Sequence, residues 1–458
     1  MKDRVQFATR IGAIAATVGS AVGLGNIWRF PYEAGQNGGA AFIAIYLLCV
    51  VVMGVPVIVA EFVIGRRSHK NVCGALRDLS PKVNMKWLAA LCITSAILII
   101  SFYSVVCGWI VEYLVQALMG NLSSAHAQDY NTVFVTFISN PYRTVMWTVL
   151  FLVANFMVMR RGLKRGVELA ANLMMPFLFL LLIVFCVFSL LQPGASKGLE
   201  FLFQPDFSAI TPRVAVGAMG QAFFSLSLGL SCLLTYASYF KDTDSLVRNA
   251  SLVAILDTLV AVLAGIMIFP IVFSYDMQPA AGPELIFQVL PAIFQQMPGG
   301  YIFAVLFFVL LFMAAITSTI SMSEILIAYF SEEFKMTRNG ASMLSTGIAI
   351  VLGTLCALSF NVISDFKIFG KTLFDLFDYV SSNILLPLGG IFFSIFVGWM
   401  LDRKLVLDEL SNNGKIRVRT ARLIIFSLRY VAPTAIIVVF LYGLGLFGWL
   451  ECFWADNL

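Results

Sequence analysis

The apolar runs of this chain constrain its fold more than any other feature. An α-helix needs roughly 20 apolar residues to cross a bilayer, and eleven segments approach or exceed that length. We place these spans at residues 11–35, 40–65, 87–119, 144–159, 167–191, 213–240, 245–275, 300–330, 341–360, 372–400 and 422–448. The chain is 60% hydrophobic and 12% charged, whereas soluble domains carry roughly 25% charged residues. The sequence therefore predicts an all-α polytopic membrane protein with 11 transmembrane helices, a single domain over residues 1–458 surrounded by the lipid bilayer.

Basic residues indicate which ends of these spans face the cytoplasm. Lys and Arg gather in the segments that follow every second span, such as 66–86, 160–165 and 403–422. Because short loops rich in Lys and Arg stay in the cytoplasm, we expect a multi-pass protein of the plasma (inner) membrane. Its N-terminus would be cytoplasmic and its C-terminus outside. The net charge of +5 then reflects topology, and no nucleic-acid partner is expected.

The sequence gives no sign of a catalytic or metal site built from Cys or His. The eight cysteines are scattered and form no CxxC pair, and the two histidines, His69 and His126, lie in predicted loops. No nucleophile–base set is visible. The GLG sequence at Gly23–Gly25 lacks the third glycine and the preceding strand of a dinucleotide-binding motif. We therefore expect that the protein is not an enzyme, and no obligate protein partner is evident.

Two spans contain residues that disfavour a continuous helix. The first includes SAVGLGNIWRFPY from Ser20, and the sixth reads GQAFFSLSLGLSCLLTYASY from Gly220. Unpaired backbone groups are not tolerated in lipid, so a break must be buried or must line a polar cavity. A GxxxG helix contact through Gly19 and Gly23 is the alternative for the first break.

The two broken spans would open two five-helix repeats, 9–191 and 213–400, with 422–448 as the eleventh helix. Interrupted helices at matching positions of two halves indicate a transporter site near the midplane. Their free N–H groups suit a carboxylate and their free carbonyls suit a small cation. The segment Pro283–Gln296 predicts a short helix, either a cap over the outer face or an ordinary amphipathic surface helix.

The stretch GSAVGLGNIWRFPY with the following NGGAAF resembles the signature of the neurotransmitter:sodium symporter family, which includes bacterial amino-acid transporters of the LeuT fold. FSLSLG, LLFMAAITSTIS and FDYVSSN also fit. The resemblance implies a LeuT-type 5+5 inverted repeat with broken helices 1 and 6. It also implies sodium-coupled symport by alternating access, with two sodium ions. Many relatives have twelve spans, so the oligomeric state stays open.

Two sodium sites follow from the resemblance, since sodium prefers several oxygen ligands. Site 1 would take the Ala21 carbonyl, the side chains of Asn26, Ser225 and Asp257, and the substrate carboxylate. Site 2 would take the carbonyls of Gly19, Val22 and Ala314 with the hydroxyls of Thr317 and Ser318. The alternative for the two hydroxyls is bonding back to their own helix turn.

Asp257 is a departure from many family members, which have asparagine there and need chloride beside residues matching Tyr46, Gln221 and Ser225. A fixed carboxylate can supply that negative charge. We therefore expect chloride-independent transport. Proton antiport through Asp257 stays open.

The resemblance also implies the substrate contacts. The carboxylate would meet the N–H groups near Leu24 and Gly25 and the hydroxyl of Tyr103, and the amino group would meet the carbonyls of Ala21, Phe224 and Ser227. Gly23 stands where monoamine transporters have aspartate, which favours an amino acid. The side-chain pocket would be lined by Ile99, Phe102, Phe224, Ser227, Leu230, Ser231, Ser318 and Met322. This apolar set predicts a neutral hydrophobic or aromatic L-amino acid, although Leu230 and Ser231 differ from some relatives and leave its size open.

Gates are expected on both sides of this site. Arg29 would pair with Asp378 outside, above Phe224, and Arg4 would pair with Glu332 inside, supported by Ser238 and Tyr239. Glu61 would brace the unwound part of the sixth span, and Glu112 and Glu324 would join packing or polar networks. The alternative functions are a non-transporting amino-acid sensor, which would need an attached soluble domain, and a channel, which would need a continuous pore. The amino acid carried, its affinity, the sodium stoichiometry and a second substrate site stay open.

Overall fold

The computed structural model describes residues 5–80, 83–122, 129–277, 282–416 and 418–446. Within these ranges the chain is helical, and its β structure is limited to a bridge between Ile368 and Lys371. The predicted all-α class is therefore confirmed for the described residues.

In the first half the predicted spans are helical, and four short helices that were not predicted lie between or after them, at 72–79, 130–138, 195–203 and 207–209. The helices of this half are α1 (Arg10–Ala21), η1 (Gly25–Arg29), α2 (Phe30–Gln36), α3 (Ala40–Cys49), η2 (Val50–Gly54), α4 (Val55–Ser68), α5 (Val72–Leu79), α6 (Lys86–Leu118), α7 (Tyr130–Ile138), α8 (Pro141–Met159), η3 (Leu163–Glu168), α9 (Leu169–Leu190), α10 (Ala195–Phe203) and η4 (Phe207–Ala209). All the η elements here are π-helical turns except η4, which is a 3₁₀ turn.

Helices also cover the predicted spans of the second half. They are α11 (Pro212–Ser225), α12 (Cys232–Ala237), α13 (Leu246–Ser274), α14 (Gly282–Glu284), η5 (Leu285–Val289), α15 (Leu290–Gln296), α16 (Gly300–Glu333), α17 (Arg338–Leu358), α18 (Leu373–Tyr379), η6 (Val380–Leu385), α19 (Leu386–Ile395), η7 (Phe396–Met400), α20 (Arg403–Leu410), α21 (Ala421–Phe426), η8 (Ser427–Val431) and α22 (Ala432–Gly443). The short helix expected at 283–296 is present as α14, η5 and α15, which pack on η1, α13 and α16.

Among the residues that the structure describes, nine helices are long and apolar enough to span a membrane. The pair Arg10–Ala21 and Gly25–Gln36 adds a tenth span, bent by 58° at its break. The sixth predicted span is divided into α11 and α12, each shorter than a span. A total of eleven thus requires that α11 and α12 be counted together, and the predicted number is not itself confirmed.

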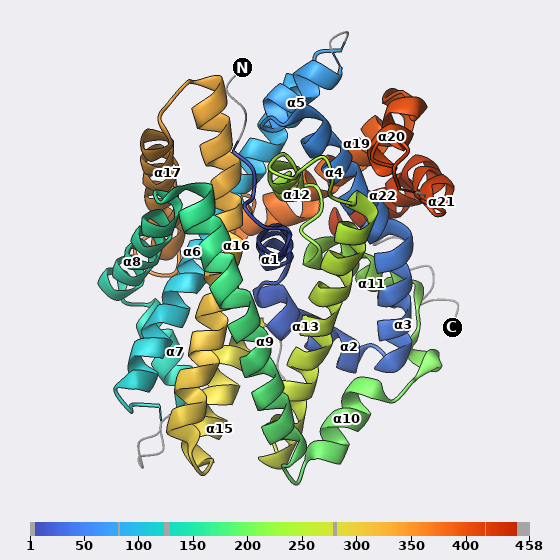
Figure 1. Ribbon diagram of the computed structural model, residues 1–458. Helices are drawn as coiled ribbons and strands as arrows, with labels where there is room; N and C mark the ends of the chain where they lie inside the picture. The colour runs from blue at the N-terminus through green and yellow to red at the C-terminus, as the bar shows by residue number, and fades with distance from the viewer. Residues whose placement is uncertain (1–4, 81–82, 123–128, 278–281, 417, 447–458) are drawn as a thin grey trace.

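The broken first span lies in the middle of the bundle. Figure 1 shows α1 between α9, α13 and α16, and α1 contacts these helices and α12. Helices α6, α8, α16 and α17 pack against one another, and α16 connects this group to α1 and α9. The end of the molecule that carries the N-terminus, α5 and α20 is called the inner side below, and the end that carries α10 and α15 is called the outer side.

Five π-helical turns have a common cause in the sequence. The turns η1, η2, η5, η6 and η8 each end two residues before a proline, at Pro31, Pro56, Pro291, Pro387 and Pro433. Proline cannot donate to the carbonyl four residues earlier, and its ring clashes with that carbonyl. A wider turn before the proline relieves the clash and lets the helix continue with a bend.

Two of the carbonyls affected in this way receive donors from neighbouring helices. Ser427 Oγ donates to the carbonyl of Val52, four residues before Pro56. Trp399 Nε1 donates to the carbonyl of Arg429, four residues before Pro433, at 3.0 Å. These bonds satisfy backbone groups that lipid could not satisfy, and they tie the second and tenth spans to the eleventh.

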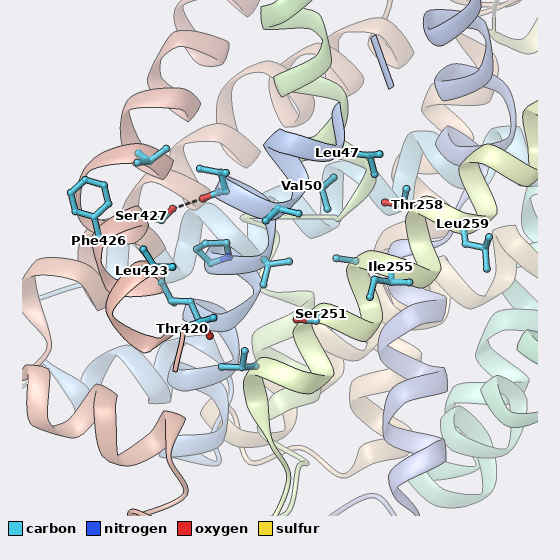
Figure 2. Close-up of a pocket in the computed structure, with 18 of the residues that line it drawn as sticks. Leu47, Val50, Ser251, Ile255, Thr258, Leu259, Thr420, Leu423, Phe426 and Ser427 are labelled. Carbon is cyan, nitrogen blue, oxygen red and sulfur yellow. Dashed lines mark hydrogen bonds between the residues drawn. The ribbon is translucent and has the colours of Figure 1, made fainter. Parts of the chain in front are cut away.

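A groove of about 780 Å³ lies on the surface of the bundle beside the first of these bonds. Figure 2 shows its walls, which come from α3 to α4, α13 and the start of the eleventh span. Its exposed side chains include Leu47, Ile255, Leu259, Leu423 and Phe426. Such an aliphatic surface suits contact with lipid chains rather than water.

Ser427→Ala tests the bond to the Val52 carbonyl. We expect it to destabilise the protein by about 1 kcal/mol, the usual size of an interhelical hydrogen bond in a membrane protein. The measurement is the melting temperature of the purified protein in detergent. Thr434→Ala is the matched control, because the Thr434 hydroxyl bonds back to Tyr430 of its own helix. An unchanged melting temperature in S427A would remove the proposed role of this bond.

Candidate functional site

The two broken spans meet at one cavity of about 330 Å³. Most of the residues predicted to bind substrate line it: Ala21, Gly23, Leu24, Gly25, Ile99, Phe102, Tyr103, Phe224, Ser225, Ser227, Leu230, Ser318 and Met322. Asn26, Arg29 and Asp378 line it as well. The structure therefore brings together residues from the first, third, sixth, eighth and tenth spans.

In the first span, side chains from the same span and from its neighbours satisfy the backbone at the break. Val22 leaves the helical conformation, and its carbonyl accepts a hydrogen bond of 2.9 Å from Ser318 Oγ. The Gly23 N–H donates to Asn26 Oδ1 at 3.0 Å, and the Leu24 N–H donates to the Tyr103 hydroxyl at 3.4 Å. Polar backbone groups of the break thus face the cavity, where an ionic group could replace these partners.

In the sixth span, the break is held by one buried carboxylate. Ser227, Gly229 and Ser231 all have positive φ, at 53°, 82° and 66°. Glu61 accepts from the Gly229 N–H at 2.9 Å and from the Leu234 N–H at 3.2 Å. This is the bracing role predicted for Glu61. The Ser227 hydroxyl also donates to the Ser20 carbonyl at 3.1 Å, which links the two breaks directly.

Three of the four predicted sodium site 1 residues form a buried polar cluster. Asn26 Nδ2 donates to Asp257 Oδ1 at 2.8 Å and to Ser225 Oγ at 3.0 Å, and Ser225 Oγ donates to Asp257 Oδ2 at 2.6 Å. All three side chains are almost fully buried. A buried carboxylate is unfavourable without a compensating positive charge, and the hydrogen-bond partners of Asp257, Asn26 and Ser225, are neutral. The cluster is therefore suited to hold a small cation.

Two buried side chains next to this cluster retain unused hydrogen-bonding capacity. The Tyr46 hydroxyl and the Gln221 amide have no hydrogen-bond partner among the described residues. Gln221 lies one helical turn before Ser225 on α11, and the Tyr46 ring packs edge-on against Phe30, one turn after Asn26. Tyr46 and Gln221 are the residues expected to flank a chloride ion in relatives, and here a carboxylate stands beside them.

Residues predicted for sodium site 2 also lie together. Ser318 Oγ bonds to the carbonyls of Val22 and Ala314, at 2.9 and 3.2 Å. Thr317 Oγ1 bonds back to the carbonyls of Met313 and Ala314, which is the alternative considered for it. Gly19 lies against Thr317, since a Cβ on Gly19 would lie 3.2 Å from Thr317 Cβ. One bond of this group, from Ser318 Oγ to the Val22 carbonyl, crosses the contact between the first span and α16.

Ser231 does not line the cavity, although the sequence placed it in the side-chain pocket. It is fully buried, its hydroxyl has no hydrogen-bond partner among the described residues, and its left-handed conformation starts α12. Seven further residues line the cavity that the sequence reading did not include: Ser20, Trp28, Val106, Pro283, Phe374, Ser382 and Leu386. Ser382 and Leu386 follow Asp378 along the tenth span at helical spacing. This spacing could have predicted that they share the cavity-facing side of the helix.

The outer gate residues face each other without forming a direct ion pair in the part of the chain that the structure describes. The Arg29 guanidinium lies 5.3 Å from the centre of the Phe224 ring. Asp378 accepts a hydrogen bond of 2.9 Å from Ser382. Arg29 and Phe224 thus contact each other at the wall of the cavity, and the role of Phe224 as a lid under the Arg29–Asp378 pair stays a prediction.

On the inner side, Arg4 lies outside the described residues, so its pairing with Glu332 stays a prediction. Glu332 accepts from the Asn71 N–H at 2.8 Å. The Ser238 hydroxyl bonds to its own helix. The Tyr239 hydroxyl donates to Glu324 at 2.8 Å.

Glu324 and Glu112, predicted to join packing or polar networks, are both paired. Arg338 donates two hydrogen bonds to Glu324. Glu112 accepts from Arg143 and from the indole of Trp147. Both acids thus belong to polar networks, Glu324 toward the inner side of the bundle and Glu112 toward the outer side.

A helical bundle with two broken spans around one cavity, beside a buried polar cluster suited to a cation, defines a secondary transporter of the inverted-repeat type. The family model described as "Sodium:neurotransmitter symporter family" matches residues 4–137 and 138–450. The chain belongs to this family, and the resemblance given by the first-span motif is confirmed.

Individual relatives agree with this assignment. An uncharacterized sodium-dependent transporter of Bacillus subtilis, YhdH, is 39% identical over 442 residues, covering 96% of this chain and 98% of the relative. An uncharacterized sodium-dependent transporter of Haemophilus influenzae is 35% identical over 455 residues, covering 97% and 99%. Among solved structures, MhsT in complex with L-phenylalanine is 42% identical with a TM-score of 0.88, covering 96% of this chain and 100% of that chain. The protein is a multi-pass membrane transporter of the LeuT fold that is coupled to sodium, and not an enzyme.

Gly229→Ala tests the geometry of the sixth-span break. A left-handed conformation costs a non-glycine residue about 1–2 kcal/mol, and the added Cβ would lie 2.2 Å from the Leu386 carbonyl oxygen. We expect a clear fall in melting temperature. Gly217→Ala in the same span should leave it unchanged or slightly higher, because nothing lies within 4 Å of its Cβ position and helical alanine is favoured over glycine. Equal melting temperatures for the two variants would contradict the strained break.

Proposed function

We propose that this protein carries a neutral hydrophobic or aromatic L-amino acid into the cell together with sodium, by alternating access around the cavity. One observation carries the proposal: the Gly23–Gly25 break and the Asn26–Ser225–Asp257 cluster lie at the same cavity. A carboxylate bound at the break would therefore lie beside a cation bound at the cluster. Each would stabilise the other, which couples the ion to the substrate.

Gly23 supports an amino acid as the substrate. A Cβ there would lie 3.1 Å from Ser318 Oγ and 3.5 Å from the Tyr103 hydroxyl. A side chain at this position would therefore occupy the space that a carboxylate needs to reach the Tyr103 hydroxyl and the break. An aspartate there would moreover repel that carboxylate.

The rest of the cavity supports an apolar side chain. Ile99, Phe102, Val106, Leu230 and Met322 line it away from the polar break. Its charged lining residues within the described ranges, Arg29 and Asp378, both lie toward the outer side. The relative MhsT was solved with L-phenylalanine, which agrees in size and chemistry with such a cavity.

Two sodium ions are part of the proposal. Site 1 would use the Ala21 carbonyl, Asn26, Ser225 and Asp257. Site 2 would use the carbonyls of Gly19, Val22 and Ala314, with the hydroxyls of Thr317 and Ser318 turned from their present acceptors. Sodium at site 2 would then fix α1 against α16 in the closed position.

The orientation proposed is the one expected from the basic loops, with the N-terminus in the cytoplasm. In this orientation we expect the cavity to open toward the outside past Arg29 and Asp378, and residues 5–9 before α1 to close it from the cytoplasm. A channel would need both ends open together, and a sensor would need no counter-movement of the two sides. The Glu324–Arg338 ion pair on the inner side and the separated Arg29 and Asp378 on the outer side suit alternating access better.

The direct test is binding of a panel of L-amino acids to the purified protein, in sodium and with potassium in its place. We expect one hydrophobic or aromatic amino acid to bind in sodium and to lose most of its affinity in potassium. Uptake of the same amino acid into proteoliposomes should need an inward sodium gradient, which excludes a sensor. Equal binding in both cations would contradict the shared site, and binding of none of the panel would contradict the substrate class.

Asp257→Asn tests chloride independence. The Asp257 carboxylate supplies a fixed negative charge beside Tyr46 and Gln221, so the parent should bind its amino acid equally well in sodium chloride and sodium gluconate. Removing that charge should make binding depend on chloride. Asp378→Asn is the control, since it removes a carboxylate near Arg29 and should leave binding insensitive to chloride. Loss of binding by the parent in gluconate would contradict the role given to Asp257.

A further inference from the structure

Glu168 makes a contact that the sodium and substrate sites do not explain. Its carboxylate accepts hydrogen bonds from the Ala8 N–H at 2.9 Å, the Thr9 N–H at 3.0 Å and the Thr9 hydroxyl at 2.9 Å. The side chain is 3% exposed. Thr9 is the N-cap of α1, so these bonds hold the residues that begin the first span.

Electrostatics favours the carboxylate at this position. The N-terminus of a helix attracts negative charge, and α1 has no acidic residue in its own first turn. Glu168 supplies the missing charge from the fifth span. Hydrogen bonds to an ionised acceptor are roughly twice as strong as neutral ones, so this contact is stronger than the neutral bond from the Phe7 N–H to the Tyr239 carbonyl.

The fit between α1 and Glu168 is close. A Cβ on Gly12 would lie 2.2 Å from Glu168 Oε1, so only glycine lets the carboxylate reach the start of the helix. Glu168 is also the last residue of the π-helical turn η3. The contact therefore joins the glycine face of α1 to an irregular turn at the inner end of the fifth span.

A seam of small residues connects this contact to the proposed sodium site 2. Gly12, Ala16 and Gly19 follow one another on the face of α1 that meets the fifth span. Ala16, Gly19, Val167, Ala171 and Thr317 line a small gap between α1, the fifth span and α16. The seam thus runs from Thr317 and Gly19 to the Gly12–Glu168 contact on the inner side.

We propose that Glu168 is a latch that keeps the inner half of the first span closed, and that its release opens the α1–α9 seam from sodium site 2 to the cytoplasm. Glu168 is a positioning residue: it acts on the start of α1 and does not contact the substrate. The proposal rests on the proposed function, because a transporter must open its inner side to release sodium. Once water enters the seam, it can solvate the carboxylate in place of the Ala8 and Thr9 donors.

Glu168→Gln tests the latch, since it keeps the size of the side chain and removes its charge. The reporter is Ala16→Cys in the seam. It is modified by a charged, membrane-impermeant methanethiosulfonate that is added outside inverted vesicles, whose outer surface is the cytoplasmic face. In potassium we expect E168Q to raise the modification rate about tenfold, the factor that corresponds to losing roughly one charge-assisted hydrogen bond. The same variant without A16C gives the background from native cysteines.

The modification rate in sodium distinguishes loss of the latch from a general loss of stability. Sodium binds the closed form better, so saturating sodium should return E168Q to the parent rate, at an apparent sodium affinity about tenfold weaker than that of the parent. A damaged fold would stay reactive in sodium. Glu112→Gln is the matched control, because Glu112 is also 3% exposed but pairs with Arg143 near the outer end of the third span, and it should match the parent.

Gly12→Ala gives an independent version of the test, because its methyl group must displace the Glu168 carboxylate without changing any charge. It should also raise the modification rate of A16C. Parent-like rates in both E168Q and G12A, or rates that sodium does not restore, would overturn the latch. Because this readout needs no amino acid, failure of the parent to bind any amino acid would instead count against the proposed function.

Discussion

Backbone hydrogen bonding inside the membrane is the constraint on which the rest of this structure depends. Hydrocarbon offers no partner to an N–H or C=O group, so each interrupted helix needs partners from elsewhere in the chain. Glu61 supplies them to the sixth span, and Ser318 supplies one to the first. The breaks that need these partners are also the surfaces that can hold ions. The contacts that satisfy the broken backbone inside the membrane are therefore also the contacts that form the binding site.

The first span connects the proposed binding site to the inner end of the bundle. Its break contributes Ala21, Gly23 and Asn26 to the cavity, and its start is held by Glu168 twelve or more residues away. A change at one end of α1 is therefore felt at the other, because a short helix moves as a unit. Coupling between ion binding and inner opening needs contacts that differ between two states, and the first span carries both the contact with Ser318 at its break and the contact with Glu168 at its start.

Sequence alone predicted most of the architecture and much of the site. The glycines of the first break and the Ser and Gly residues of the sixth marked the interruptions correctly, and Glu61 was given its bracing role. Ser231 is absent from the cavity lining, and its left-handed backbone conformation at the start of α12 is a feature that residue type does not reveal. Glu168 was missed because it lies at the edge of a span and its partners lie about 160 residues earlier. The π-helical turns before the prolines follow from the steric clash of the proline ring, and they could have been predicted from the sequence.

The most direct test of the shared site is equilibrium binding of radioactive sodium to the purified protein, with and without a saturating amino-acid ligand. The account predicts that the ligand tightens sodium binding by the same factor by which sodium tightens ligand binding, since coupling free energies are reciprocal. It also predicts that Asn26→Ala abolishes this coupling. Sodium binding that is indifferent to the ligand would mean that ion and substrate occupy separate sites, and would contradict the central claim.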